Sequence, residues 1–452
     1  MSEREQAAGQ ASAFGRPGPA APADEGRAPS WAALPWGSRD LLPAACRLRR
    51  ALTSTVLSTF EAWGYEPVAT PAIEYFEVLG RGLSEADRRG CVRFIAAGSG
   101  ELVTLRADVT PQVARMLAQR LGGELPADVV HRFSYAAEVL RQPTEARQRA
   151  EIHQVGIELV GDGDPAADAE LVALADASLR AAGLRRFRLD LAHTAIARGL
   201  LDGLGLPEAR RAEAHARLAR KDREGLAQAL EHYGCSAAPS RATVALCDLF
   251  GTPAQVLARA SEVLAGTDVD EALGQLTATL EHLRAFGDDV VSRVTLDLGE
   301  ARGFDYYSGI RVRGWAPGVH HPVVRGGRYD GLPRRYGVPL PATGFAVDLD
   351  ALEAALHEQG ERPATAEPPA AHLVAVAPGP LAAEIRDHAQ RRARRARVRG
   401  HRAWVQPGVN LERARTLAEA AGAGHLTFVD AQGATTWVRG PDGWAAAAEE
   451  TP

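Results

Sequence analysis

The feature that most constrains the fold of this chain is a long helical stretch between two groups of strand-like segments. Residues 207–290 contain runs with helical spacing, such as PEARRAEAHARLARKDREGLAQALEHYG. Strand-like segments precede this stretch, as in RFSYAAEVLR, and follow it, as in SRVTLDLG and ATGFAVDLD. The pattern predicts an α+β domain whose mixed sheet is interrupted by a helical insertion at about residues 200–290.

Changes in composition predict the domain limits. Residues 1–30 are rich in Ala, Gly, Pro and charge, so we expect a disordered tail that cannot bury enough apolar surface to order. The main domain is expected over residues 31–360, and a linker follows at HEQGERPATAEPPA. Strand and helix patterns alternate beyond the linker, which predicts a small α/β domain over residues 369–452 with a partly parallel sheet.

Composition also narrows the class of protein. The formal net charge is −5, so no overall basic field favours nucleic acid. The 4 cysteines are scattered and form no CxxC pair, which argues against a metal site or disulfides and fits a reducing compartment. No long apolar run or signal-peptide pattern is evident, so we expect a cytoplasmic protein without membrane contact. We also expect no cofactor. The arginine run RRARRARVRG is interpreted as a solvated helix face rather than a nucleic-acid site.

Four polar segments predict a binding pocket: LRADVTP, VLRQPTEARQRAEIHQVGIELVG, ARGFDYYSG and RGGRYDGL. Gln154 and Glu158 lie four residues apart on a predicted strand, so both side chains share one face, and Arg141 ends the preceding strand. Carboxylates, an arginine, an amide and phenols suit a small zwitterion that carries a hydrogen-bonding ring. A Glu–Tyr pair can bracket the two nitrogens of an imidazole.

In this order, the four segments resemble the catalytic domain of histidyl-tRNA synthetases, which are class II synthetases. LPWGSRDLLP resembles the segment that leads into the first class motif, VLR with HQVGIELVG resembles the second, and PATGFAVDLDALEAAL resembles the third. ARGFDYYSG and RGGRYDGL resemble the family's two histidine-specific segments. The resemblance implies an antiparallel sheet flanked by helices, and residues 369–452 resemble, more weakly, a reduced anticodon-binding domain.

The resemblance assigns roles to individual side chains. Asp108 and Thr110 would face the α-amino group of histidine, and Gln154 would contact its backbone. Glu158 and Tyr307 would bracket the imidazole. Arg302 would lie near the carboxylate, while Tyr306 and Tyr329 would support the pocket wall. The predicted histidine-binding residues are therefore Asp108, Thr110, Arg141, Gln154, Glu158, Arg302, Tyr306, Tyr307 and Tyr329.

Departures from the synthetase pattern concern ATP. Ala351 stands where the third motif needs an arginine for the γ-phosphate, and Pro143 stands where the second motif places a glutamate that reads adenine. Asp348 replaces a small residue and would repel phosphates if it faced them. Losing a phosphate arginine removes several kcal/mol of charge stabilisation by order of magnitude, so we expect adenylation to be lost and no catalytic residue to remain.

This split pattern is similar to the regulatory subunits of ATP phosphoribosyltransferase. That resemblance implies a non-catalytic chain that assembles with a short-form catalytic subunit, supports the first step of histidine biosynthesis and takes part in feedback by histidine. Residues 34–68 resemble a dimerisation motif and predict a homodimer. Two alternatives stay open at this point: a divergent but active histidyl-tRNA synthetase, and another synthetase-like paralogue with a different amino acid or partner.

Overall fold

The computed structural model describes residues 32–126, 129–143, 149–301, 307–361, 370–379 and 383–447. Its largest element is a nine-stranded sheet with the strand order β1-β5-β6-β12-β11-β10-β7-β9-β8. Most neighbouring strands in this sheet are antiparallel, while β1 with β5 and β7 with β9 are parallel. The strands are β1 (Glu66–Pro67), β5 (His131–Leu140), β6 (Glu151–Val160), β7 (Arg188–His193), β8 (Phe250–Gly251), β9 (Val294–Asp297), β10 (Ile310–Trp315), β11 (Val324–Arg328) and β12 (Ala342–Asp348).

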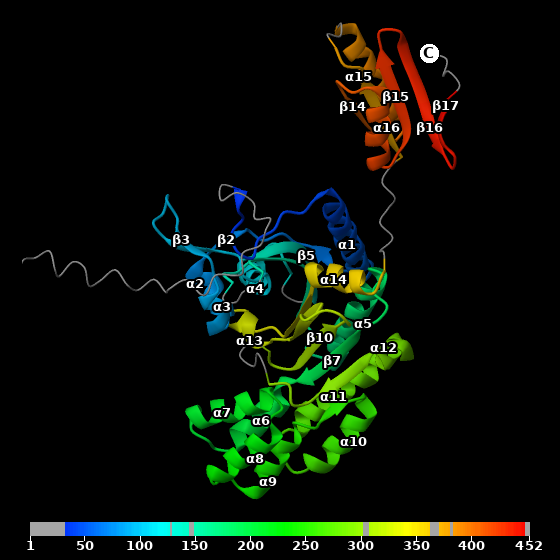
Figure 1. The fold of residues 1–452 in the computed structure, drawn as a ribbon. Helices are drawn as coiled ribbons and strands as arrows, with labels where there is room; N and C mark the ends of the chain where they lie inside the picture. Colours follow the sequence, from blue (N-terminus) through cyan, green and yellow to red (C-terminus); the bar gives the residue numbers. More distant parts are fainter. Residues whose placement is uncertain are drawn as a thin grey trace, which may run out of the picture.

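Helices cover one face of this sheet (Figure 1). α1 buries Leu52, Val56 and Phe60, which lie four residues apart on one helix face, and the chain turns at Gly64 with φ +82°. The helices are α1 (Pro43–Ala62), α2 (Phe76–Leu79), α3 (Glu85–Arg89), α4 (Thr110–Arg120), α5 (Pro165–Ala181), α6 (Thr194–Gly203), α7 (Glu208–Ala219), α8 (Arg223–His232), α9 (Ala237–Ala245), α10 (Pro253–Val263), α11 (Asp270–Leu283), α12 (Asp288–Ser292), α13 (Gly331–Arg334), α14 (Leu349–Glu358), α15 (Ala383–Val398) and α16 (Leu411–Ala420). None of the described helices is long and apolar enough to cross a membrane.

Side chains along β6 alternate between the two faces of the large sheet, and only one of these faces packs into the main core. Val155, Ile157 and Leu159 are fully buried in the main core, which also contains α1 and α5. The residues between them face the opposite side of the sheet, because successive strand residues alternate. The strand pattern of RFSYAAEVLR is confirmed as β5, which pairs antiparallel with β6 from His131↔Val160 to Leu140↔Glu151.

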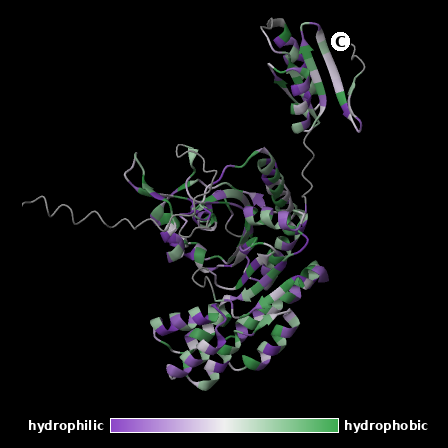
Figure 2. Ribbon diagram, in the orientation of Figure 1, coloured by the Kyte–Doolittle hydropathy of each residue, from purple (hydrophilic) through white to green (hydrophobic). Residues whose placement is uncertain are grey.

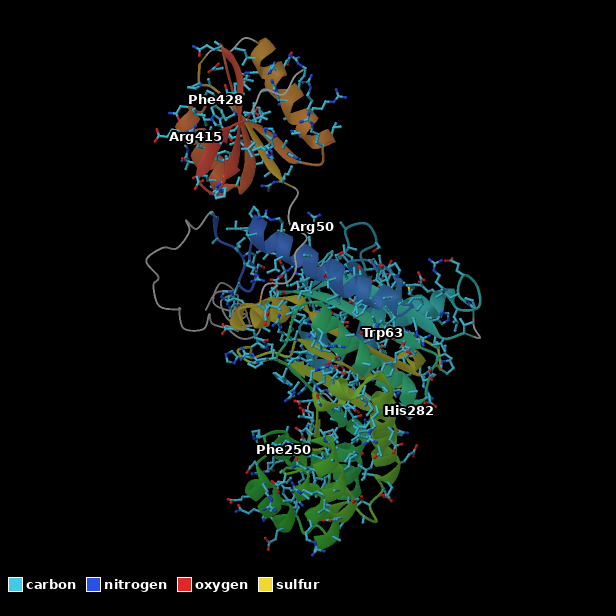
Figure 3. The ribbon with its side chains drawn as sticks, turned by 90° about the vertical axis from the view of Figure 1, so that its right-hand side faces the viewer. Arg50, Trp63, Phe250, His282, Arg415 and Phe428 are labelled. Atoms are coloured by element: carbon cyan, nitrogen blue, oxygen red, sulfur yellow. The ribbon has the colours of Figure 1, made fainter. Side chains whose placement is uncertain are left out.

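After β7 the chain runs through a helical region before β9, which pairs with β7 in parallel, and the short strand β8 within that region pairs with β9 at the edge of the sheet. Residues 207–290 between these strands contain α7 to α11 and the short strand β8. Hydrophilic and hydrophobic residues alternate along these helices in Figure 2, as expected for amphipathic helices that pack on each other. Trp63, labelled in Figure 3, stacks on Phe286 with ring centroids 5.6 Å apart and so joins the end of α1 to this region.

Two smaller sheets complete the described fold. The segment CVRFIAAGSGELVTLRA forms a hairpin of β3 (Arg93–Ile95) and β4 (Leu102–Leu105), and β2 (Ile73–Tyr75) pairs with β4 on its other side. The C-terminal sheet has the order β14-β13-β15-β16-β17. Its first three strands are parallel, which agrees with the partly parallel sheet that the sequence predicted. Its strands are β13 (Ala371–Val376), β14 (Arg402–Gln406), β15 (Ala423–Asp430), β16 (Gly433–Gly440) and β17 (Gly443–Ala446). The antiparallel β16–β17 hairpin was not predicted, because its residues are mostly exposed and give little apolar alternation.

Candidate functional site

A cavity of about 910 Å³ opens on the face of the large sheet opposite α1 and α5. Its floor is formed by residues of β6, β10, β11 and β12, and its walls include α3 and the start of α4. The polar and charged residues that line it are Ser84, Asp87, Arg89, Asp108, Thr110, Tyr135, Arg141, Gln142, Arg149, Gln154, Tyr307, Arg311, Arg313, His321, Arg325, Tyr329 and Asp348. Such a dense polar lining suits a small charged ligand rather than an apolar one.

Glu158 lies beneath this lining and is only 2% exposed. The Thr110 hydroxyl donates a hydrogen bond of 2.6 Å to Glu158 Oε1, whereas Oε2 makes no hydrogen bond of normal geometry among the described residues. Burial raises the pKa of Glu158 well above its ordinary value; Asp108 adds to this effect, and Thr110 and the nearby Tyr135 hydroxyl oppose it. A buried carboxylate oxygen without a hydrogen bond lowers the stability of the fold, and it can accept a hydrogen bond from a ligand N–H.

Gln154 occupies the same face of β6 as Glu158, as the strand pattern predicted. Its Oε1 is buried and has no hydrogen-bond partner among the described residues. Gly156 lies between the two residues, and a Cβ at that position would collide with the Tyr135 ring and hydroxyl. The floor of the cavity therefore offers two acceptor oxygens on either side of a position that only glycine fits.

Asp108 stands at the cavity wall beside Arg141. Arg141 Nη2 lies 3.6 Å from Asp108 and its Nη1 lies 3.4 Å from Asp87, while its Nε donates to the Ala107 carbonyl at 2.9 Å. Burial raises the pKa of Asp108, and Arg141 counteracts part of the shift. Arg141 is thus held by two carboxylates and a carbonyl, which fixes its direction at the cavity edge.

Two tyrosines complete the pocket beside Glu158. Burial raises the pKa of Tyr307 to about 12, so its phenol stays protonated and able to donate at neutral pH. Tyr329 is 3% exposed. A Cβ at Gly344 would collide with Glu158 Oε2 and would stand 2.6 Å from the Tyr329 hydroxyl oxygen, so these two groups meet over the bare Cα of Gly344.

Of the residues predicted for histidine, six line the cavity and a seventh, Glu158, hydrogen-bonds to one of the six. The six are Asp108, Thr110, Arg141, Gln154, Tyr307 and Tyr329. Arg302 and Tyr306 lie outside the described residues. The four polar segments are far apart in sequence, and the sheet brings the described parts of all four to one cavity.

Asp348 does not act as the free repulsive charge that the sequence suggested. Its carboxylate accepts hydrogen bonds from Arg149 at 2.5 and 3.1 Å and caps α14 by accepting from the Ala351 backbone N–H at 3.0 Å. Asp350, next along the chain, is bound by Arg39, Arg49 and Arg149. Burial alone would raise the pKa of Asp350, but these guanidinium groups hold it below its ordinary value.

Sequence reasoning missed several cationic groups of the cavity: Arg89, Arg149, Arg311, Arg313 and Arg325. The signal for two of them was present in GIRVRGW, where two arginines at alternate positions of a strand must share one face. Arg325 was not assigned, because RGGRYDGL was interpreted through its resemblance to a histidine-specific segment and not as part of a strand, whereas Val324–Arg328 forms β11.

Comparisons with known proteins agree with this architecture. The family described as histidyl-tRNA synthetase matches residues 37–352. An ATP phosphoribosyltransferase regulatory subunit of Anaeromyxobacter dehalogenans strain 2CP-1 is 40% identical over 330 residues, which cover 73% of this chain and 93% of the relative. Proteins of the same name from Symbiobacterium thermophilum and Moorella thermoacetica are 39% and 36% identical, covering 80% and 86% of this chain and 88% and 96% of their own lengths.

Solved structures give the same result for the fold. A Bacillus halodurans protein described as an ATP phosphoribosyltransferase regulatory subunit/histidyl-tRNA synthetase superposes with a TM-score of 0.74 at 25% identity, covering 89% of this chain and 99% of its own. A histidyl-tRNA synthetase from Nostoc sp. PCC 7120 superposes with a TM-score of 0.72 at 19% identity, covering 92% of this chain and 96% of its own, which supports the fold alone. The expected class II synthetase-like fold is confirmed. The chain belongs to the histidyl-tRNA synthetase family and, within it, to the ATP phosphoribosyltransferase regulatory subunits.

Proposed function

We propose that this chain is a non-catalytic regulatory subunit that binds histidine in the cavity and transmits feedback to a short-form catalytic ATP phosphoribosyltransferase. The complex would carry out the first step of histidine biosynthesis. The observation that carries the histidine site is Glu158, a carboxylate 2% exposed with one oxygen lacking a hydrogen bond among the described residues. An imidazole N–H would supply the missing donor, and a charged hydrogen bond of this kind contributes about 1.5–3 kcal/mol.

The other groups suit the remainder of a histidine molecule. The Asp108 carboxylate and the buried Gln154 Oε1 are acceptors for an α-ammonium group. The protonated Tyr307 phenol can donate to the second imidazole nitrogen. Arg302 is proposed for the α-carboxylate, on the resemblance of ARGFDYYSG to a histidine-specific segment.

The sequence also supports the loss of adenylation. Pro143 has no carboxylate with which to read adenine, and Ala351 has no guanidinium for a γ-phosphate. Ala351 is 6% exposed and belongs to the main core, and the neighbouring Asp350 is engaged by three arginines. The runner-up function, an active synthetase, requires histidine-dependent pyrophosphate exchange, which we expect to stay at background in the purified chain.

The decisive experiment joins this chain to the short-form catalytic subunit. The two proteins are co-expressed and co-purified, and phosphoribosyltransferase activity is measured with and without histidine. We expect the catalytic subunit to need this chain for full activity, and histidine to inhibit the complex. A catalytic subunit that neither associates with this chain nor responds to it would exclude the regulatory assignment.

A second measurement isolates the pocket. Histidine should bind the chain or its complex, and histidinol, which lacks the carboxylate, should bind far more weakly. Removing one partner of a desolvated ion pair costs about 2–5 kcal/mol, so if Arg302 binds the carboxylate the loss should be at least roughly 30-fold. Equal binding of the two compounds would show that no arginine reads the carboxylate.

We also propose a homodimer through residues 34–68, without the catalytic subunit being needed. Leu34, Trp36 and Leu42 in this segment are 50%, 55% and 73% exposed in the single chain. Exposed apolar groups in one segment favour an isologous interface with a second copy. A monomer in sedimentation at micromolar concentration would contradict this proposal.

A further inference from the structure

The helical region that interrupts the large sheet is attached to both ends of the segment ARGFDYYSG. The described residues at these ends are Ala301, which follows β9, and Tyr307, which precedes β10. α7 reaches the first end and α6 reaches the second. Tyr307 also lines the cavity, so these attachments bear directly on the proposed histidine site.

His215 on α7 holds the first end. Its Nε2 lies 2.5 Å from the carbonyl oxygen of Ala301, a residue with no exposed surface. A carbonyl oxygen can only accept a hydrogen bond, so His215 donates from Nε2. The ring is half-buried, between the buried residues Ala214 and Leu218 of the same helix. α7 therefore fixes the position of the residue that directly precedes Arg302 in the sequence.

The chain before Ala301 is held by the residue that follows α7. Lys221 comes after the C-cap residue Arg220 and has a φ of +56°, in the left-handed region where helix ends usually place glycine. Its Nζ lies 2.5 Å from Asp297 Oδ1, and the same oxygen accepts from the Gly299 N–H at 3.1 Å. A glycine at position 221 would relax the backbone but lose this ion pair. The ion pair with the end of β9 therefore gives a physical reason for lysine at this position.

Gly299 allows a close approach between this chain segment and the helical region. A Cβ at Gly299 would stand 2.2 Å from the Leu246 carbonyl oxygen and 2.6 Å from Lys221 Nζ. The neighbouring Leu298 N–H donates to the Leu249 carbonyl at 3.0 Å. Both carbonyl groups belong to the turn that follows α9. The stretch after β9 is therefore bound directly to the helical region.

α6 holds the second end. Arg198 Nη2 donates to the Tyr307 carbonyl oxygen at 3.0 Å, and the Thr194 hydroxyl lies 3.2 Å from the same oxygen. The Thr194 N–H donates to the Gly309 carbonyl at 3.0 Å. Thr194 is 1% exposed, and Arg198 Nη2 also donates to its hydroxyl at 3.2 Å. A charged donor on the Tyr307 carbonyl thus fixes the backbone from which the phenol projects.

α6 and α7 belong to one packed group of helices. They contact each other, α7 contacts α8, and α9 contacts both α6 and α8. Leu200 of α6, Leu218 of α7 and Leu246 after α9 are buried in the same core. In Figure 1 these four helices lie together at the bottom of the view, away from α1. Because packed helices shift as units, a displacement of the group moves both ends of the segment together.

We propose, on the basis of the proposed function of histidine binding, that Arg198 and His215 are positioning residues of the histidine site. Through them, helices α6 to α9 set the affinity of that site. A hydrogen bond from the Tyr307 phenol to an imidazole requires placement within about 0.5 Å. Any partner that shifts these helices alters the affinity for histidine, and histidine alters the affinity for that partner by the same factor.

Four variants of the full chain test these two contacts. His215→Leu and Arg198→Met remove the donors with little change in the length of the side chain. His215→Gln keeps an N–H donor near the position of Nε2. His232→Leu is the matched control, since His232 is exposed on α8 of the same helix group. Titration calorimetry gives the Kd for histidine, and thermal unfolding gives the melting temperature.

We expect His215→Leu and Arg198→Met each to raise the Kd about 2- to 30-fold, the range of coupling through residues that do not touch the ligand. His215→Gln should restore most of the affinity, and His232→Leu should bind like the parent chain. If both donor-deleting variants bind histidine like the parent, or if His232→Leu loses as much affinity as they do, the inference is overturned while the proposed function stands.

Hydrogen–deuterium exchange without histidine separates this inference from the proposed function. The Ser308 N–H donates to the Arg328 carbonyl at 2.8 Å, and the Gly299 N–H donates to Asp297. We expect both amides to exchange faster in the two donor-deleting variants, with the C-terminal sheet unchanged. A parent chain that binds no histidine would exclude the proposed pocket, and exchange would still decide the positioning role. Faster exchange confined to these amides supports that role, whereas exchange equal to the parent's, or faster throughout the chain, overturns it.

Discussion

Glu158→Gln is the most informative single change to the proposed histidine pocket. Glutamine keeps the size of the side chain and can still accept the hydrogen bond from Thr110, now 2.6 Å from Glu158 Oε1. It removes only the negative charge that faces Gly344 and Tyr329. The substitution therefore separates the charge of Glu158 from its packing.

The expected loss in histidine affinity follows from the hydrogen bond that the imidazole would make. A hydrogen bond to a charged group contributes about 1.5–3 kcal/mol, which corresponds to roughly a 10- to 140-fold rise in Kd. The stability of the folded chain without histidine should instead increase. Since burial raises the pKa of Glu158, the charged form destabilises the folded protein, and glutamine removes that cost.

The pH dependence of stability fixes the sign of this effect. A carboxyl whose pKa is raised by folding binds its proton more tightly in the folded state, so its contribution to stability falls as pH rises above its unfolded value of about 4.3. The melting temperature of Glu158→Gln should therefore exceed that of the parent chain by a margin that grows from pH 5 to pH 8. Thermal unfolding without histidine measures this margin.

Glu101→Gln is the control for this experiment, since Glu101 is exposed next to the β3–β4 turn and lies outside the cavity. Titration calorimetry at pH 7 would compare both variants with the parent chain, alone and in the complex. If Glu158→Gln binds histidine as tightly as the parent and melts at a lower temperature, the carboxylate is structural and the reasoning is refuted.

Three further predictions concern the frame of the site. Gly344→Ala should weaken histidine binding more than tenfold and cost about 1–3 kcal/mol of stability, because its Cβ would stand 2.6 Å from the Tyr329 hydroxyl oxygen. Calorimetry would measure the binding and thermal unfolding the stability. Unchanged binding would contradict the close approach. Asp168→Ala should destabilise the fold by about 3–5 kcal/mol in denaturant titrations, because buried Arg328 loses the carboxylate that lies 2.9 Å from its Nε. A loss under about 1 kcal/mol would show that Arg328 finds another partner. His193→Gln should make the stability of the fold less sensitive to acid. Burial lowers the pKa of His193 to about 4, so about 3 kcal/mol of stability is lost as the pH falls from about 6.5 to below about 4. An identical pH profile of the melting temperature in the variant would refute this assignment.

The sequence predicted the parts of the site that depend on local periodicity. The spacing of Gln154 and Glu158 was sufficient to place both on one face of β6, because side chains alternate along a strand. The strands β5 and β6 themselves followed from their apolar patterns, whereas their antiparallel pairing was seen only in the structure. Arg302 and Tyr306 stay predictions, since they lie outside the described residues.

Features that depend on register between distant strands could not be predicted from one sequence. Arg313 meets Arg325 only because β10 pairs with β11 in one particular register, and shifting that register by one residue would turn either side chain to the opposite face. The partners of Asp348 were hidden for the same reason. Arg149 is 199 residues away in sequence, so no local pattern reveals that it neutralises Asp348.

This neutralisation changes what the missing ATP residues imply. The sequence alone presents Asp348 and Ala351 as two losses at one phosphate site. In the fold, Asp348 and Asp350 bind Arg149, and Asp350 also binds Arg49 of α1, so the two carboxylates join α14, α1 and the segment before β6. An arginine placed at Ala351 would enter a position 6% exposed beside this clamp, where it would compete for carboxylates already engaged. Restoring that one charge should therefore disturb the ion pairs of Asp348 and Asp350 rather than recreate a γ-phosphate site.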